Sequence, residues 1–451
     1  MRHLFGTDGI RGVAGEYPLD RRTTRLIGRA LGHFLSSKTR NSSVVIGEDT
    51  RESSSAIAAA VASGLESAGA RVESAGVITT PGIAFLARTG EFAAGIVISA
   101  SHNPWQDNGI KVFGHDGYKL PDDVELEIEK EIFSQLGADS GNEPLASKPL
   151  RASTELHHHY VKWLQSTVDA AKLGSLRVVV DSANGAASVI APEVFRACGV
   201  RATFVSNQPD GRNINQQCGA LHPEVVARAV RELHADVGIT LDGDADRALF
   251  SDAAGNVING DAVMLLAARE MKARGSLAND TVVATTMSNM GLEAALRRSG
   301  IRMLRAPVGD KYVLEEMRKT GVTLGGEQSG HIIFRDGDAT TGDGLLTALR
   351  VLEIVGRSGK PLAELVSDLK VFPQIIKNVR VREKKPLSEI PEVASAIGAA
   401  ERDLDGSGRV VVRYSGTEAL ARVMIEAESE EKMKRHAEAI ARSIQSAIGT
   451  S

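Results

Sequence analysis

The chain has few cysteines, no excess of one charge and no long apolar run. Its 451 residues include two cysteines, Cys198 and Cys218, whose surroundings match no metal-binding spacing and suggest no disulfide framework. The formal net charge of −4 gives no overall attraction to nucleic acid or to an anionic membrane. No apolar stretch approaches the roughly 20 residues of a membrane span. We therefore expect no nucleic-acid or membrane partner.

The first residues, MRHLFGTDGIRG, lack the apolar segment of a secretory signal, so a reducing cytoplasm is the expected location. The composition, 42% hydrophobic and 24% charged, is that of a globular protein. Because 451 residues exceed one ordinary domain, the length predicts three or four domains.

A pattern of apolar run, polar or glycine-rich turn and helical stretch occurs three times. The three copies begin at Val44, Val178 and Val282. Each helical stretch ends in a glycine that precedes an apolar residue and an arginine, namely Gly69, Gly199 and Gly300. Apolar runs that alternate with helices indicate parallel, buried strands. The repeat predicts three related α/β domains, and one large doubly wound sheet is the alternative.

The C-terminal part departs from this repeat. From Val371 onward, strand-like segments alternate with two helical ones, which indicates a small α+β domain. The predicted fold class is α/β: three related domains with mixed, mostly parallel sheets plus this smaller domain, around a central cleft. The expected boundaries are 1–150, 151–256, 257–369 and 370–451.

In each repeat a third strand leads directly into an unusual loop. The three loops contain the strings SASHNP, DGDADR and GGEQSGH. Open α/β sheets bind ligands beyond the carboxyl ends of their strands. We therefore expect the three loops to converge on one cleft.

The second loop is acidic. Asp242, Asp244 and Asp246 alternate with small residues, so in an extended segment their carboxylates would point the same way. Clustered carboxylates favour a hard cation such as Mg²⁺. An EF-hand is excluded, because Arg247 and Ala253 occupy its glycine and glutamate positions. A solvated acidic turn is the alternative, and the apolar run before the loop argues against it.

Ser101 follows an apolar strand in the first loop. The GxSxG string of a serine hydrolase is absent there. Opposite a metal site, a serine could carry a phosphoryl group, with the metal binding one phosphate oxygen. An ordinary helix cap by Ser101 or Asn103 is the competing interpretation, and the aspartate loop favours the phosphoserine.

The third loop presents Glu327, Ser329 and His331 at alternate positions. A carboxylate and a hydroxyl at that spacing suit neighbouring sugar hydroxyls, and a histidine can transfer a proton near neutral pH. A histidine beside an apolar strand is also commonly structural.

A fourth loop, RYSGTEALAR, has the composition of a phosphate pocket: forked guanidinium groups, hydroxyls and glycine amides. Its candidate residues are Arg413, Ser415, Gly416, Thr417 and Arg422. An exposed hairpin turn is the alternative. Arg11 lies in a glycine-rich turn and Lys111 follows the Ser101 loop. Either could neutralise a phosphoryl oxygen or assist proton transfer, and surface charges are again the alternative.

These strings together resemble the α-D-phosphohexomutase superfamily, from FGTDGIRG at one end to RYSGTEALARVMIEA at the other. The resemblance covers essentially the whole chain, and the family's architecture of three α/β domains plus a small fourth agrees with the repeat. FGTDGIRG, SASHNPWQDNGIKVF, VVDSANGAA and NINQQCGALHPE are most similar to the bacterial branch that acts on glucosamine phosphates.

The resemblance implies roles for individual residues. It makes Ser101 the phosphoserine, and makes Ser101, Asp242, Asp244 and Asp246 the magnesium ligands. It assigns Glu327 and Ser329 to sugar contacts, and Arg413, Ser415, Gly416 and Thr417 to the distal phosphate, with Arg422 beside them. It matches His331, Lys111 and Arg11 to proton-transfer or electrostatic helpers, and Arg247 to the substrate-binding residue after the metal loop.

The sequence departs from the family pattern at two places. The family usually has RPSGTEPL, whereas Tyr414 and Ala419 replace both prolines here. Loss of two rigid residues is expected to loosen the phosphate loop. Trp105 and Gln106 replace a more usual Phe-Tyr pair.

The implied activity interconverts glucosamine 6-phosphate and glucosamine 1-phosphate through a bisphosphorylated sugar, and feeds UDP-N-acetylglucosamine and cell-wall synthesis. It implies one Mg²⁺ per subunit and a hexosamine or hexose 1,6-bisphosphate as primer. A phosphoglucomutase or phosphomannomutase is the alternative within the superfamily. A phosphatase that uses the aspartate loop and a non-catalytic sugar-phosphate sensor are alternatives of other classes. A homodimer is the assembly we consider.

Overall fold

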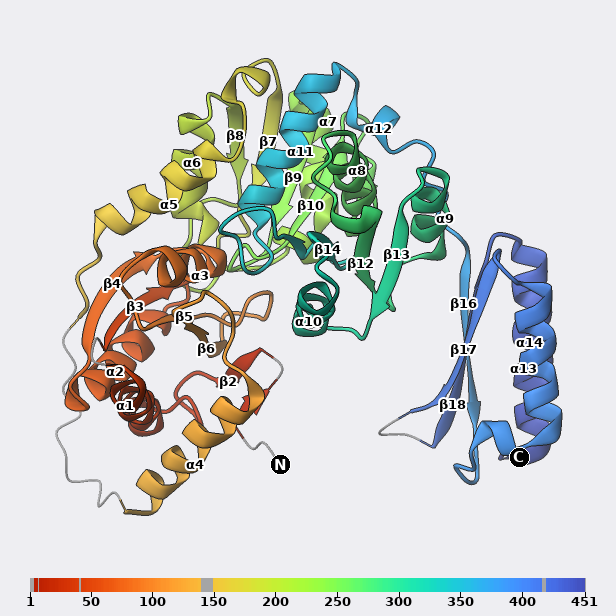
Figure 1. Cartoon of the computed structure of the whole chain (residues 1–451), viewed down its shortest axis with the longest axis horizontal. Helices are drawn as coiled ribbons and strands as arrows, with labels where there is room; N and C mark the ends of the chain where they lie inside the picture. Colours follow the sequence, from red (N-terminus) through yellow and green to blue (C-terminus); the bar gives the residue numbers. More distant parts are fainter. Residues whose placement is uncertain (1–3, 7, 40–41, 139–148, 416–418, 451) are drawn as a thin grey trace. The chain divides into compact units, whose positions relative to one another are not determined.

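Four β-sheets with accompanying helices make up the chain in the computed structural model (Figure 1). The structure describes residues 4–6, 8–39, 42–138, 149–415 and 419–450. These residues form two compact units, each described by itself: one of Met1–Thr286 with Leu304–Val366, the other of Met287–Met303 with Ser367–Ser451. In the part of the chain that is described, no helix is both long and apolar enough to cross a bilayer.

The N-terminal sheet has six strands in the order β1-β2-β6-β5-β3-β4. Strands β3, β4 and β5 are parallel, whereas β1, β2 and β6 join by antiparallel pairing. The strands are β1 Phe5–Gly6, β2 Gly9–Val13, β3 Ser43–Glu48, β4 Arg71–Val77, β5 Ala94–Ile98 and β6 Asp107–Gly114. The helices are α1 Arg21–Lys38, α2 Ser54–Ser67, α3 Thr80–Thr89 and α4 Asp122–Ala138.

The second sheet has five strands in the order β11-β10-β9-β7-β8. Strand β7 is parallel to β8 and β9, and β9 turns back into the antiparallel β10. The strands are β7 Arg177–Asp181, β8 Arg201–Val205, β9 Val237–Leu241, β10 Ala248–Asp252 and β11 Val257–Ile258. The helices are α5 Thr154–Ser166, α6 Ala187–Ala197 and α7 Pro223–Leu233, with 3-10 turns at Ala170–Lys172 and Gly219–Leu221.

The third sheet has four strands in the order β13-β12-β14-β15. Strand β14 pairs in parallel with β12 and antiparallel with β15. The strands are β12 Thr281–Thr285, β13 Arg302–Ala306, β14 Leu324–Gly326 and β15 Ile332–Phe334. The helices are α8 Gly260–Ala273, α9 Met290–Arg298, α10 Asp310–Thr320, α11 Gly344–Ser358 and α12 Leu362–Leu365, with a 3-10 turn at Ala278–Asp280.

The predicted strand–helix–strand repeat is present three times, as β3-α2-β4, β7-α6-β8 and β12-α9-β13. The glycine after each helix is left-handed, with φ of 85° at Gly69, 69° at Gly199 and 67° at Gly300. A side chain at these positions would be strained, which explains why glycine ends each helix. The prediction of three related α/β domains is confirmed.

The smaller unit contains a three-stranded antiparallel sheet in the order β16-β18-β17. Helices α13 and α14 cover one face of it (Figure 1). The elements are β16 Gln374–Arg380, α13 Pro391–Asp403, β17 Gly408–Tyr414, β18 Leu420–Ala427 and α14 Glu430–Ile448, with a 3-10 turn at Leu387–Glu389. This confirms the smaller α+β C-terminal domain.

The segment 287–303 belongs to the same compact unit as the C-terminal sheet. The Asn289 side chain accepts a hydrogen bond from the Phe372 amide at 2.8 Å, and the Met290 amide donates to Glu426 at 2.7 Å. The four domain boundaries given above stay a prediction. Cys198 and Cys218 are both free and buried, and burial raises the pKa of each thiol to about 11.

Candidate functional site

Ser101 lies three residues beyond the end of β5 and is almost completely buried. Its φ of 52° places a non-glycine residue in the left-handed region. The Ser101 amide donates to the Ser99 hydroxyl at 3.0 Å, which holds this conformation. The strand end thus presents the Ser101 hydroxyl in one fixed direction.

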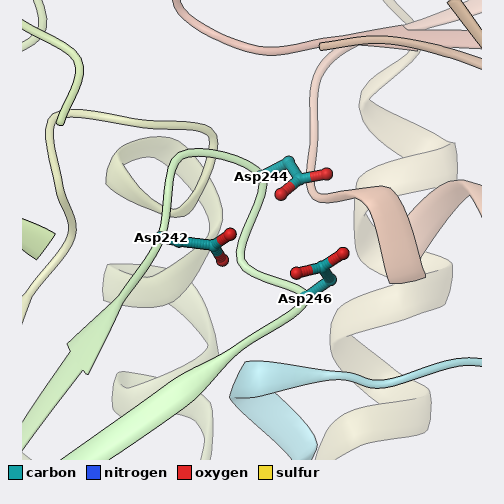
Figure 2. A group of neighbouring side chains, drawn as sticks. All are labelled: Asp242, Asp244 and Asp246. Atoms are coloured by element: carbon teal, nitrogen blue, oxygen red, sulfur yellow. The ribbon is translucent and has the colours of Figure 1, made fainter. Parts of the chain in front are cut away.

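The three aspartates lie in the tight connection between β9 and β10, and their carboxylates face a common space (Figure 2). One carboxylate oxygen from each lies within 4.8 Å of the others. The expectation that an extended segment aligns them is wrong, because residues 243–246 form a turn and bend in which Ala245 is left-handed, with φ of 55°. Convergence therefore comes from the turn and not from strand alternation.

Neighbouring elements hold this aspartate turn from several sides through its backbone. The Asp244 carbonyl accepts from the Thr80 amide at 3.0 Å, at the start of α3. The Ala245 carbonyl accepts from the Gly344 amide at 2.9 Å, at the start of α11. The position of the carboxylates is therefore fixed by two helix N-termini.

The Ser101 loop and the aspartate turn are in direct contact. The Ser101 hydroxyl donates to an Asp242 carboxylate oxygen at 2.7 Å, although 141 residues separate them in sequence. The second Asp242 oxygen accepts from the Arg247 amide at 3.2 Å. The structure thus brings together the candidate phosphoserine and the candidate metal ligands.

The donor set fits a divalent cation. Asp244 and Asp246 each keep one buried carboxylate oxygen without a hydrogen-bond partner among the described residues. Burial, and then the charges of Asp246 and Asp244, hold the pKa of Asp242 well above its usual value. Burial and mutual repulsion thus disfavour the charged form of this carboxylate, and a hard cation bound among the oxygens would offset both. This buried triad can therefore hold a metal ion.

Lys111, on β6, points its buried ammonium group at the same carboxylates. Its Nζ lies 2.7 Å from Asp244 and 3.0 Å from Asp8, and 3.8 Å from Asp246. Burial alone would lower the pKa of Lys111, but these carboxylates raise it well above its usual value. Lys111 is therefore a permanent cation beside the aspartate turn.

A chain of alternating charges continues from Asp8. Lys119 contacts Asp8 at 2.5 Å and Asp310 at 2.6 Å. Burial opposes ionisation of Asp8, yet Lys111, Lys119 and Arg11 hold the pKa of that carboxyl well below its usual value. Through Lys119, this series of ion pairs connects Asp8, next to the first sheet, with Asp310 at the start of α10.

The third loop reaches the same place from the end of β14. His331 is buried, its Nδ1 lies 3.7 Å from Asp246, and its Nε2 accepts from the Gly342 amide at 3.0 Å. An Nε2 that accepts leaves the imidazole proton on Nδ1, which faces Asp246. Glu327 accepts from the Gly309 amide at 3.1 Å. Ser329 is exposed, with its hydroxyl 3.4 Å from Glu327.

A cavity of about 440 Å³ lies over this cluster. Its lining includes the candidate residues Arg11, Arg247, Glu327, His331 and Asp246, together with His102 and Asp8. Its volume is in the range of small-molecule sites. Burial and the nearby Arg247 and Arg11 lower the pKa of His102, which faces the Ser101 hydroxyl at 3.3 Å. The cavity thus combines charged side chains of both signs with apolar ones such as Leu4 and Val308, a lining that suits a small polar ligand such as a sugar phosphate.

The fourth loop lies in the smaller unit. Arg413 on β17 is directly opposite Arg422 on β18. The Arg422 guanidinium is 3.5 Å from the Ser415 hydroxyl, and Lys384 donates to the Ser415 carbonyl at 2.7 Å. Gly416 and Thr417 lie outside the described residues. Because cross-strand partners share one face of a sheet, the two arginines place like charges on the same face, which favours an anion there.

Comparisons with known proteins agree with this arrangement over the whole chain. The phosphoglucomutase/phosphomannomutase family matches in four parts: α/β/α domains I, II and III over residues 2–137, 158–255 and 259–372, and the C-terminal domain over residues 376–443. A curated relative from Koribacter versatilis, named phosphoglucosamine mutase, is 66% identical and spans 100% of this chain and 98% of its own.

The chain belongs to the phosphoglucosamine mutases of the α-D-phosphohexomutase superfamily. It is therefore an enzyme of the isomerase class. A relative of the same name from Solibacter usitatus is 53% identical over 99% of both chains. A solved phosphoglucomutase/phosphomannomutase family protein from Burkholderia thailandensis is 26% identical, with a TM-score of 0.78 over 98% of this chain and 99% of that one. The alternative of a phosphoglucomutase or phosphomannomutase is not favoured.

The structure of this phosphohexomutase adds residues that sequence reasoning did not single out: Asp8, Asp49, Arg51, His102, Lys119, Asp310 and Lys384. Asp8 lies in the string FGTDGIRG with Arg11, and His102 directly follows Ser101, so both belong to motifs that the sequence already marked as functional. Asp49 and Arg51 follow the apolar run of β3, where buried charges are rare, and that position was a signal as well.

Tyr414 and Ala419, which replace the two prolines of the superfamily pattern, both make hydrogen bonds at the ends of the fourth loop. The Tyr414 hydroxyl donates to the Lys385 carbonyl at 2.5 Å, and the Ala419 carbonyl accepts from the Val381 amide at 2.9 Å. These bonds restrain both ends of the fourth loop without proline.

Proposed function

We propose that the chain interconverts glucosamine 6-phosphate and glucosamine 1-phosphate by passing a phosphoryl group through Ser101. The observation that carries this proposal is the 2.7 Å hydrogen bond from the Ser101 hydroxyl to Asp242, beside a cavity of about 440 Å³ that several charged side chains line. A serine that is held against a metal-binding carboxylate turn has the surroundings that a phosphoserine needs. The curated relatives named phosphoglucosamine mutase support the choice of glucosamine.

Two transfers in opposite directions make up the reaction. In the first, the free hydroxyl oxygen of the sugar monophosphate bonds to the phosphorus of phosphorylated Ser101, and the bond from Ser101 Oγ to phosphorus breaks. The proton of that hydroxyl passes to the site, and a sugar bisphosphate results. In the second, Ser101 Oγ bonds to the phosphorus of the other phosphoryl group of the bisphosphate, and the bond from that phosphorus to its sugar oxygen breaks. That oxygen takes back the proton held by the site, which regenerates the phosphoserine and releases the isomeric monophosphate.

The cation is proposed to be Mg²⁺, one per subunit, bound by Asp242, Asp244, Asp246 and the Ser101 oxygen. The oxygen-only donor set supports this choice. Bound there, it would supply charge neutralisation at the transferred phosphoryl group. Lys111 adds a fixed positive charge from the buried side of the same carboxylates.

The cavity residues are proposed to bind the sugar phosphate. Arg11 and Arg247 would neutralise phosphoryl oxygens, and Glu327 with Ser329 would accept and donate hydrogen bonds to sugar hydroxyls. His331 would move a proton at its Nδ1, where the Gly342 contact leaves the imidazole proton. Arg11, Arg247, Glu327 and His331 all line the cavity, and Ser329 lies beside Glu327, with its hydroxyl 3.4 Å from that carboxylate.

The fourth loop is proposed to bind the phosphate that is not reacting. The paired positions of Arg413 and Arg422 on neighbouring strands, with Ser415 beside Arg422, support this role. Gly416 and Thr417 would add a backbone amide and a hydroxyl. We also propose a cytoplasmic location, a homodimer, the four domain boundaries given above, and a hexosamine or hexose 1,6-bisphosphate as the primer that first phosphorylates Ser101.

The test is a mutase assay with glucosamine, glucose and mannose phosphates as substrates, in the presence of Mg²⁺ and a trace of hexose 1,6-bisphosphate. We expect glucosamine phosphate to have the highest kcat/KM, and Ser101→Ala to abolish turnover. The matched control is Ser37→Ala, which removes an exposed hydroxyl on α1 and should keep wild-type activity. Mutase turnover by Ser101→Ala at the wild-type rate would reject the phosphoserine.

A further inference from the structure

Arg51 uses all of its side-chain donors on the loop that carries Ser101 and on one carboxylate. Its Nη2 donates to the carbonyls of Ser101 and Asn103, both at 2.9 Å. Its Nη1 donates to the carbonyls of Pro104 and, at 3.0 Å, of Asp107. Because five N–H groups are all the donors that a guanidinium has, and Nε binds Asp49, none remains for a ligand.

Asp49 holds the other side of the same loop. Its carboxylate accepts from Arg51 Nε at 2.8 Å and from the Ser99 hydroxyl at 2.7 Å. The Ser99 hydroxyl in turn accepts from the Ser101 amide at 3.0 Å. The pair Asp49–Arg51 therefore fixes both peptide groups of Ser101: the amide through Ser99, and the carbonyl directly.

This double restraint acts on a residue in an unfavourable conformation. Ser101 has φ of 52°, which non-glycine residues adopt only when their surroundings impose it. Both members of the restraining pair are excluded from solvent, with side-chain exposure of 0%. The buried hydrogen bonds from Arg51 and Ser99 thus restrain the backbone of Ser101, the residue proposed to carry the phosphoryl group.

We propose that Arg51 is a positioning residue that sets the place and direction of the Ser101 oxygen for phosphoryl transfer. The proposal rests on the function proposed for Ser101. Arg51 has no donor free for substrate or phosphate, so its effect passes through the backbone of residues 101–107. It acts in both states of Ser101, because the acceptors are main-chain carbonyls that phosphorylation leaves unchanged.

Lysine cannot replace this group. An ammonium has three donors on one atom and cannot reach four separated carbonyls and a carboxylate together. We expect Arg51→Lys to lower kcat by about 100-fold, the loss that a misplacement near 1 Å brings to a reacting group. KM for the sugar phosphate should stay close to the wild-type value, since the substitution changes none of the residues proposed to bind the sugar phosphate.

The experiment compares wild type, Arg51→Lys and the control Arg228→Lys, which changes an exposed arginine on α7. Each folded protein is first phosphorylated on Ser101, then mixed with glucosamine 6-phosphate, and the rate of phosphate loss from Ser101 is measured in a single turnover. The expected result is a slow transfer in Arg51→Lys alone, at a temperature where all three proteins are folded by circular dichroism.

Two further measurements separate positioning from general stability. Arg51→Ala should regain transfer rate when guanidinium ion is added below unfolding concentrations, whereas sodium ion should have no effect. Ser99→Ala removes the hydroxyl that joins the Ser101 amide to Asp49 and should slow transfer as well, which covers the case in which Arg51→Ala does not fold.

The outcomes are distinct. If the wild-type protein shows no mutase turnover, or turnover that does not depend on Ser101, the proposed function itself is rejected. A wild-type protein that turns over, with Arg51→Lys transferring phosphate equally fast per folded molecule, would overturn the positioning role and leave the proposed function standing.

Discussion

Replacing Gly243 with alanine should push the Ser101 loop away from the aspartate turn. A Cβ at Gly243 would lie 2.4 Å from the Ser101 carbonyl oxygen, whereas ordinary contact begins at 3.4 Å. The clash is with backbone, and Gly243 does not have a left-handed φ, so the effect of alanine is purely steric. The two loops must therefore separate by about 1 Å.

This separation should break the hydrogen bond between Ser101 and Asp242 and slow the reaction. The bond from the Ser101 hydroxyl to Asp242 is 2.7 Å long, and about 1 Å more takes it beyond hydrogen-bonding distance. Misplacement of that size lowers the rate of a reaction by about 100-fold. Overpacking of this kind lowers the free energy of unfolding by about 1–3 kcal/mol. Gly243→Ala should thus stay folded at moderate temperature but lose most of its turnover.

The assay measures kcat for glucosamine phosphate and the unfolding midpoint in urea. Gly137→Ala is the matched control, because a Cβ at that exposed position of α4 meets nothing within 4 Å. It should keep wild-type kcat. A Gly243→Ala protein that turns over within about twofold of the wild-type rate would show that the contact between the two loops does not control transfer.

Two other predictions concern stability and substrate binding. Burial raises the pKa of Asp343 to about 6, from an ordinary value of 3.8. Its protonated form therefore adds stability that is complete below about pH 4 and is lost as pH rises through about 6. Relative to Asp343→Asn, the wild type should lose roughly 1 kcal/mol of unfolding free energy between about pH 5 and pH 7 in urea titrations, and a gain over that range would contradict the sign. Arg413→Ala should raise KM for glucosamine 6-phosphate about tenfold through the loss of a charge-assisted bond, with the exposed Arg402→Ala on α13 as control. An unchanged KM would remove Arg413 from the phosphate site.

Much of the larger unit was predictable because its signals are local. Apolar runs that end in Ser101 or Asp242 identify strands, and glycines such as Gly69 mark helix ends. The aspartate turn shows the limit of such patterns. Alternating acids suggested an extended segment, but the left-handed Ala245 and the bonds from α3 and α11 make a turn instead. Those contacts join segments that are distant in sequence.

The charged network around the site was less accessible for the same reason. Lys119 and Asp310 are 191 residues apart, and each alone is an ordinary surface residue type. Only the fold places them at 2.6 Å and joins them to Asp8. Arg51 likewise binds main-chain carbonyl groups, and because every residue has one, the sequence does not show which carbonyls are its partners.

The most direct test of the central claim locates the phosphoryl group on the chain. The protein is incubated with Mg²⁺ and hexose 1,6-bisphosphate, digested, and mapped by tandem mass spectrometry, before and after a chase with glucosamine 6-phosphate. We predict one phosphoryl group on Ser101 that the chase removes as sugar bisphosphate. Label on an aspartate of the turn, or label on Ser101 that the chase leaves in place, would contradict transfer through this serine.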